Sequence, residues 1–182
     1  MNIYEEMQDR AYNAGMNVIG YTFRNKTIKG LYCDGTAAIS NNIDTNAEKA
    51  CVLAEELGHH LTSAGNILSL SDVGSRKQEF RARMHAYNNM IGLIGIITAY
   101  EHGCRNTYEM AEYLNVTEEF LNDALDAYRN KYGVCTTVDN YVIYFIPALI
   151  VMKDLWPVEL IAGNNEAIMK FKKHDFLCFI YY

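Results

Sequence analysis

The strongest constraint on the fold of this chain is the segment at residues 45–61. Thr45 followed by Glu48 has the pattern of a capping box, in which the threonine hydroxyl and the glutamate carboxylate satisfy free backbone N–H groups. Apolar residues then recur at helical spacing at Ala50, Leu53, Leu57 and Leu61. The segment therefore predicts an amphipathic helix whose apolar stripe lies on a core.

The same helix carries acids and imidazoles near its end, at Glu55, Glu56, His59 and His60. Residues four apart lie on one face of a helix, so Glu55 and His59 can bind one metal ion. The spacing is that of the H-E-x-x-H motif of zinc hydrolases, with a glutamate in place of the first histidine. Glu56 keeps the position of the general base and His59 that of the second ligand.

Three other readings of this cluster stay open. His60 is rotated by about 100° from His59 and could bind the same ion only if the helix frays at Gly58. Glu56 and His60 also form a pair four residues apart, but that pair leaves no carboxylate as base. The plainest alternative is a solvated helix face with two chance histidines. The position of the cluster, late in an apolar helix, favours a site.

A hydrolytic zinc site needs a third protein ligand. Glu79 is the best candidate, because it begins the next predicted helix and is followed by Ala82 and Ala86, small residues that allow helices to approach closely. His85 is a rival, but it lies six residues after Glu79 and points off a different face.

The segments around this helix predict an α+β fold that is mainly helical. Short apolar or β-branched runs at 18–23, 30–33 and 36–39 indicate a small antiparallel sheet packed on the motif helix, with Asp34-Gly35 as a hairpin turn. A helical region follows, with a late hairpin at 134–137 and 141–146.

These patterns divide the chain into three parts. Residues 1–92 form the core that holds the motif, and residues 93–152 form a helical subdomain that ends in the hairpin. The tail at 153–182 has no clear periodicity, and no structure is assigned to it.

Composition excludes several classes of protein. The net charge of the 182 residues is −6, which argues against a primary role in binding nucleic acid phosphates. The apolar runs at 90–100 and 141–152 are shorter than the ~20 residues that span a bilayer, so buried core is expected and a membrane is not. No secretory signal is visible. Five widely spaced cysteines without a C-x-x-C pair are typical of mostly buried, reduced thiols in a cytoplasmic protein.

The motif segments resemble a known family, the ImmA/IrrE metallopeptidases, and most of all the branch carried by phages and other mobile elements. The residues that carry the resemblance are 53–60 (LAEELGHH), 65–68 (GNIL), 78–83 (QEFRAR) and 86–87 (AY). The resemblance covers roughly residues 1 to 150. It implies a zincin-like core and a cytoplasmic zinc endopeptidase that cleaves a partner repressor of the helix-turn-helix type.

Carried over to this chain, the resemblance makes His59 and Glu79 metal ligands and Glu56 the base, with Glu55 at the position of the family's first histidine. Two carboxylates and one imidazole largely cancel the charge of the ion, which weakens its effect on a bound water. Oxygen ligands also suit Mn²⁺ or Fe²⁺ as well as zinc. The alternative is a non-catalytic, metal-free relative that acts by binding a regulator.

Residues 109–120 also have the rhythm of a helix-turn-helix, which would suggest DNA reading. The second helix of that unit, however, carries four acids that phosphates would repel, namely Glu118, Glu119, Asp123 and Asp126. We therefore expect a packing unit, or a surface that binds the partner protein, and no direct contact with nucleic acid.

Overall fold

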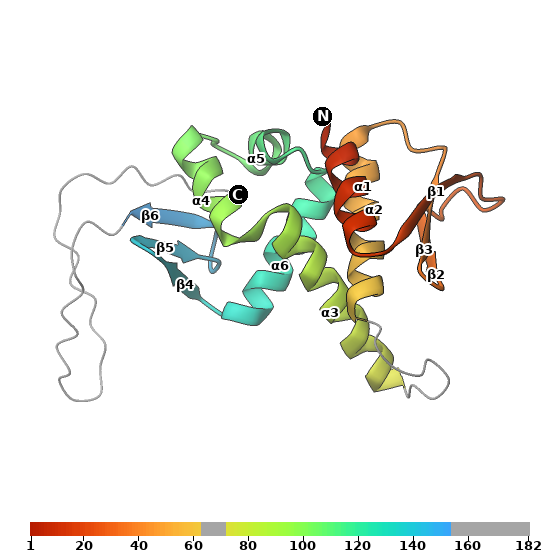
Figure 1. Cartoon of the computed structure of the whole chain (residues 1–182). Coiled ribbons are helices and arrows are strands. Elements are labelled where there is room, and N and C mark those ends of the chain that lie inside the picture. The colour runs from red at the N-terminus through yellow and green to blue at the C-terminus, as the bar shows by residue number, and fades with distance from the viewer. Residues whose placement is uncertain (63–71, 154–182) are drawn as a thin grey trace, which may run out of the picture.

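The computed structural model describes residues 1–62 and 72–153 of the chain. The segment 65–68 and all but the first residue of the predicted tail at 153–182 lie outside the described residues. Figure 1 shows the N-terminal sheet on one side of the motif helix, a long helix beside that helix, and a second sheet at the far end of the molecule.

The N-terminal part consists of two helices and three strands. In chain order these are α1 (Ile3–Asn13), β1 (Asn17–Tyr21), β2 (Gly30–Cys33), β3 (Thr36–Ser40) and α2 (Asn46–Thr62). The predicted hairpin is confirmed: β2 and β3 pair antiparallel, and Asp34 and Gly35 at the turn both have positive φ angles, 45° and 77°. Such angles favour glycine and short polar residues.

The sheet differs from the prediction at its first strand. β1 pairs with β3 in parallel, so the strand order is β1-β3-β2 and the sheet is mixed rather than antiparallel. Residues 22–29 connect β1 to β2, and β2 pairs with the edge of β3 opposite to β1. The central position goes to β3, whose Ala37 and Ile39 are buried.

The motif helix α2 forms as predicted. The Thr45 hydroxyl accepts a hydrogen bond from the Glu48 N–H at 3.1 Å, which is half of the capping box. The Glu48 carboxylate instead forms an ion pair with Lys29 Nζ at 2.7 Å, which ties α2 to the start of β2. The apolar stripe is buried as far as Leu57, whereas Leu61 is 46% exposed.

The helix α3 (Asp72–Met90) packs against α2 at very short range. A Cβ atom added to Gly58 would lie 2.2 Å from the carbonyl oxygen of Ala82, and both Ala82 and Ala86 are fully buried. The small residues therefore allow the close approach that the sequence predicted. This close approach brings together side chains on adjoining turns, among them His59 and Glu79.

The rest of the described chain forms three helices and a second sheet. These are α4 (Gly92–His102), α5 (Thr107–Leu114), α6 (Glu118–Tyr132), β4 (Cys135–Val138), β5 (Tyr141–Tyr144) and β6 (Ile150–Lys153). The predicted hairpin is β4 and β5, which pair antiparallel. The strand β6 was not predicted, because its apolar residues continue the run that begins at Tyr141.

The two ends of the described chain share one core. The rings of Tyr87 on α3 and Phe120 on α6 meet edge to face at 5.0 Å, and the buried cluster extends from Met7 to Val151. The apolar runs supply buried residues such as Ile96 and Ile143, as expected. Within residues 1–62 and 72–153, no helix has the length and apolar character needed to cross a membrane.

The four cysteines in the described ranges are free thiols. Cys51 and Cys104 are buried, Cys135 is half-buried and Cys33 is exposed, so the expected burial holds for two of them. Cys178 lies outside the described residues.

The contact at Gly58 generates a stability prediction. Replacing Gly58 with alanine should lower the free energy of unfolding by about 2 kcal/mol, because the methyl group meets backbone atoms that cannot rotate away. The measurement is urea denaturation of the variant and the wild type.

A matched control is Gly95→Ala in α4. Its added Cβ would meet the Leu114 Cδ2 atom at 3.3 Å, the mobile end of a side chain, so this variant should be neutral or gain up to ~1 kcal/mol from helix propensity. If Gly58→Ala and Gly95→Ala lowered the free energy of unfolding by the same amount, the close approach of α2 and α3 would be contradicted.

Candidate functional site

The candidate site begins with a pair of side chains that face each other between α2 and α3. His59 Nε2 lies 3.5 Å from Glu79 Oε2, and the two side chains are 29% and 45% exposed. That separation is too long for a good hydrogen bond. It equals the edge of a tetrahedron with ligand bonds of 2.0–2.2 Å, which is about 3.4 Å. The pair therefore fits two ligands of one metal ion in type and spacing.

Glu55 lies one turn before His59 on the same face of α2. Burial raises the pKa of its carboxyl group, the positive charge of Arg83 lowers it, and the negative charge of Glu79 raises it. Within the described ranges, however, no three His, Cys, Asp or Glu side chains are grouped closely enough to hold a metal ion. The structure brings His59 and Glu79 together, while the ligand set with Glu55 stays a prediction.

The Glu56 carboxylate lies beside strand β2. A Cβ atom on Gly30 would lie 2.5 Å from Glu56 Oε1, so β2 can pass this carboxylate only because residue 30 is glycine. Burial raises the pKa of Glu56 to about 7, with further contributions from Glu55 and Glu79, and the backbone N–H of Tyr32 opposes the rise. Glu56 is thus a half-buried carboxyl group whose pKa is near neutral, as suits a general base or acid.

His60 has a different role from its neighbour. Its Nε2 lies 3.0 Å from the Ala14 carbonyl oxygen and must donate, while its Nδ1 lies 2.9 Å from the Tyr32 hydroxyl. That hydroxyl accepts from the Gly35 N–H, so it donates to Nδ1. Both ring nitrogens are engaged, and His60 ties α2 to the end of α1 and to β2 without a nitrogen free for a metal.

His85 does not join the pair of His59 and Glu79. It is half-buried, and its Nδ1 atom is buried without a hydrogen-bond partner within the described part of the chain. Its position six residues after Glu79 turns it to another face of α3, as the spacing predicted.

Arg83 is the residue that the sequence analysis missed. Its Nε donates to Glu79 Oε1 at 2.7 Å, one turn along α3. The signal was present, because an acid and a base four residues apart on a helix form an ion pair. Glu79 therefore uses one carboxylate oxygen for Arg83 and turns the other toward His59.

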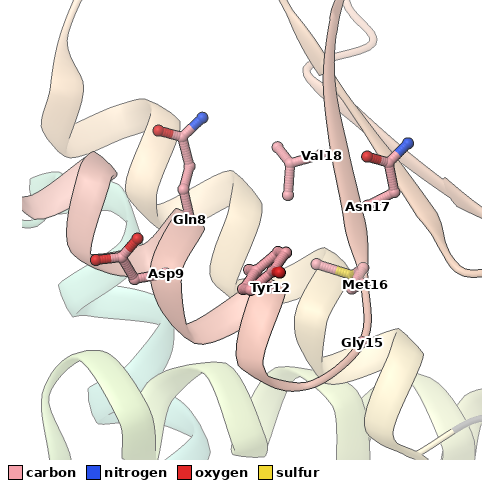
Figure 2. A pocket seen from close by; sticks show the side chains of 7 residues that line it. All are labelled: Gln8, Asp9, Tyr12, Gly15, Met16, Asn17 and Val18. Atoms are coloured by element: carbon pink, nitrogen blue, oxygen red, sulfur yellow. The ribbon is translucent and has the colours of Figure 1, made fainter.

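A cleft of about 180 Å³ adjoins this cluster between α2, α3 and α6. Glu55 and Arg83 line one end of it, and Phe120 and Asp123 of α6 line another part. A larger hollow of about 480 Å³ lies between α1 and β1, where Figure 2 shows Val18 pointing from the strand toward the helix. The larger hollow shares no lining residue with the motif, whereas Glu55 of the motif lines the smaller cleft.

A helix that presents a half-buried glutamate and a histidine, with a carboxylate from the next helix facing that histidine, is a framework for a metallopeptidase. A family model described as Peptidase_M78, IrrE N-terminal-like domain, matches residues 14–126, which include every candidate residue named above. The chain belongs to this family. No curated protein matches the chain. The family resemblance in the sequence is thereby confirmed, whereas the phage branch stays a prediction.

The raised pKa of Glu56 predicts how stability depends on pH in metal-free protein. Between the ordinary value of 4.5 and about 7, the folded protein binds more protons than the unfolded chain, so its stability should fall as pH rises through this window. Glu56→Gln removes the buried charge. The variant should be more stable than the wild type at pH 8 and lose most of that advantage at pH 5.

The measurement is urea unfolding at both pH values in the presence of EDTA, with exposed Glu112→Gln as the control. A difference between Glu56→Gln and the wild type that is the same at pH 5 and pH 8 would show that Glu56 ionises normally.

Proposed function

We propose that this protein is a metal-dependent endopeptidase. The observation that carries the proposal is the 3.5 Å separation of His59 Nε2 and Glu79 Oε2, on two helices whose backbones almost touch. Membership of a metallopeptidase family supports it. His59 and Glu79 already face each other, and a bound cation would draw in Glu55 as the third ligand.

The residues that would hold the cation are Glu55, His59 and Glu79. Zinc is the expected metal, and the two carboxylates also suit Mn²⁺ or Fe²⁺. When bound, a divalent cation supplies Lewis-acid polarisation of the scissile carbonyl group.

Glu56 is the base in the proposed reaction. It takes a proton from the water that attacks the carbonyl carbon and later donates this proton to the leaving amine. A cation held by the three proposed ligands would lower the pKa of Glu56 from the value near 7, so that the carboxylate would be ionised when it accepts the proton. Gly30 leaves room for this carboxylate beside β2.

The proposed substrate is a repressor of the helix-turn-helix type in the cytoplasm, so that cleavage regulates a phage or another mobile element. The resemblance to ImmA/IrrE peptidases supports this part of the proposal. So does the charge of α6, on which four acids are exposed: Glu118, Glu119, Asp123 and Asp126. Such a surface repels DNA and attracts the basic surface of a DNA-binding protein.

Replacing the base tests the mechanism. Glu56→Gln should lower the rate of repressor cleavage by about 100-fold or more without loss of bound metal, because the side chain keeps its shape but cannot accept the proton. The substrate is a repressor encoded beside this gene, and cleavage is followed by gel electrophoresis and mass spectrometry. Glu6→Gln on α1 is the control. Unchanged cleavage by Glu56→Gln would remove Glu56 from the mechanism.

The alternative function, a non-catalytic protein that binds a regulator, is favoured by one observation: Glu55 stands where the H-E-x-x-H motif has its first histidine ligand. Elemental analysis of protein purified without added metal separates the two functions. The peptidase should carry about one equivalent of metal, as a mononuclear site does, and His59→Ala should lose it. A folded protein free of metal would support the binding function.

A further inference from the structure

We propose that Arg83 is a positioning residue that supplies the countercharge for Glu55 and turns Glu79 toward His59. Its part in catalysis rests on the proposed peptidase function, whereas its part in the charge balance of the folded chain does not.

The two oxygens of the Glu79 carboxylate face different side chains. Glu79 Oε1 accepts a hydrogen bond from Arg83 Nε at 2.7 Å, and Glu79 Oε2 lies 3.5 Å from His59 Nε2. A flexible, half-exposed glutamate would otherwise sample several rotamers. The Arg83–Glu79 hydrogen bond spans one turn of α3, so it fixes which way the Glu79 carboxylate turns.

Glu55, which stands in place of the first histidine of the H-E-x-x-H motif, adds negative charge to the candidate site. In a site with H-E-x-x-H and a third glutamate ligand, the base and that ligand carry two negative charges, which a divalent cation cancels. Glu55 adds a third negative charge beside Glu56 and Glu79. The guanidinium of Arg83 supplies the third positive charge, so the site with its cation becomes neutral again.

The surroundings of Glu55 show why this countercharge is needed. Asp123 and Glu119 of α6 act on Glu55 as further negative charges, and Arg83 opposes them. Lys29 also lines the cleft, but its ammonium group is bound to Glu48 at 2.7 Å and lies 3.8 Å from Glu119. Arg83 lines the same cleft as Glu55 and forms a hydrogen bond with Glu79 at 2.7 Å, so its charge lies beside both acids.

A double-mutant cycle tests the countercharge in metal-free protein at pH 8, with EDTA present. Arg83→Gln should lower Tm by roughly 3–6 °C in the wild-type background, because it leaves Glu55 unpaired among acids. In the Glu55→His background the same change should cost about 1–2 °C, the size of a lost helical ion pair with Glu79. Glu55→Gln serves as a second neutral background if Glu55→His folds poorly.

Two further variants separate charge from geometry. Arg81→Gln removes the same charge from an exposed position of α3 and should leave Tm unchanged in either background. Arg83→Lys keeps the charge but not the planar donor, so it should restore most of the Tm loss and less of the rate of repressor cleavage.

The proposal is overturned if Arg83→Gln costs the same Tm in the wild-type, Glu55→His and Glu55→Gln backgrounds. This outcome is distinct from a failure of the peptidase function. A protein that binds no metal and cleaves no repressor, yet shows the coupling between Glu55 and Arg83, refutes the peptidase and retains the countercharge. A protein that binds metal and cleaves the repressor, but shows no coupling between Glu55 and Arg83, supports the peptidase function and refutes the countercharge.

Discussion

The site depends on the contact between Gly58 of α2 and the backbone of Ala82 in α3. Ordinary helices pack with axes 8–10 Å apart because side chains separate them. Here no side chain fits at position 58, and the helices meet backbone to backbone. This contact brings a histidine of one helix next to a glutamate of the other. The same small residues that stabilise the core also set the distance between the two candidate ligands.

A second constraint is the concentration of negative charge around the end of α2. Glu55, Glu56 and Glu79 lie close enough to influence one another, and burial raises the pKa of the first two. A chain gains no stability from such a cluster unless cations offset it. Arg83 offsets part of it within the described residues. The divalent cation of the proposed reaction would offset the rest of this charge.

The sequence alone predicted the parts that rest on local rules. The helix α2 followed from its capping residues and apolar spacing, the hairpin of β2 and β3 from Asp34-Gly35, and the nearness of Glu79 to His59 from the small residues after Glu79. The role of Glu79 as a ligand stays a prediction. The parallel pairing of β1, the strand β6 and the hydrogen bonds of His60 to Ala14 and Tyr32 could not be predicted. The contacts of β1 and His60 join segments far apart in the chain, and no spacing in the sequence records them, whereas the residues of β6 continue an apolar run that gives no sign of a second strand. Arg83 was open to prediction, because its partner lies one helical turn away.

The most direct test of this account is a crystal structure of the protein grown with zinc, with anomalous diffraction measured on both sides of the zinc absorption edge. The account predicts one strong anomalous peak between His59 Nε2 and Glu79 Oε2, with a carboxylate oxygen of Glu55 completing the protein ligands and Arg83 still on Glu79 Oε1. A structure in which the Arg83 guanidinium lies between Glu55 and Glu79, with no anomalous peak beside His59, would contradict it.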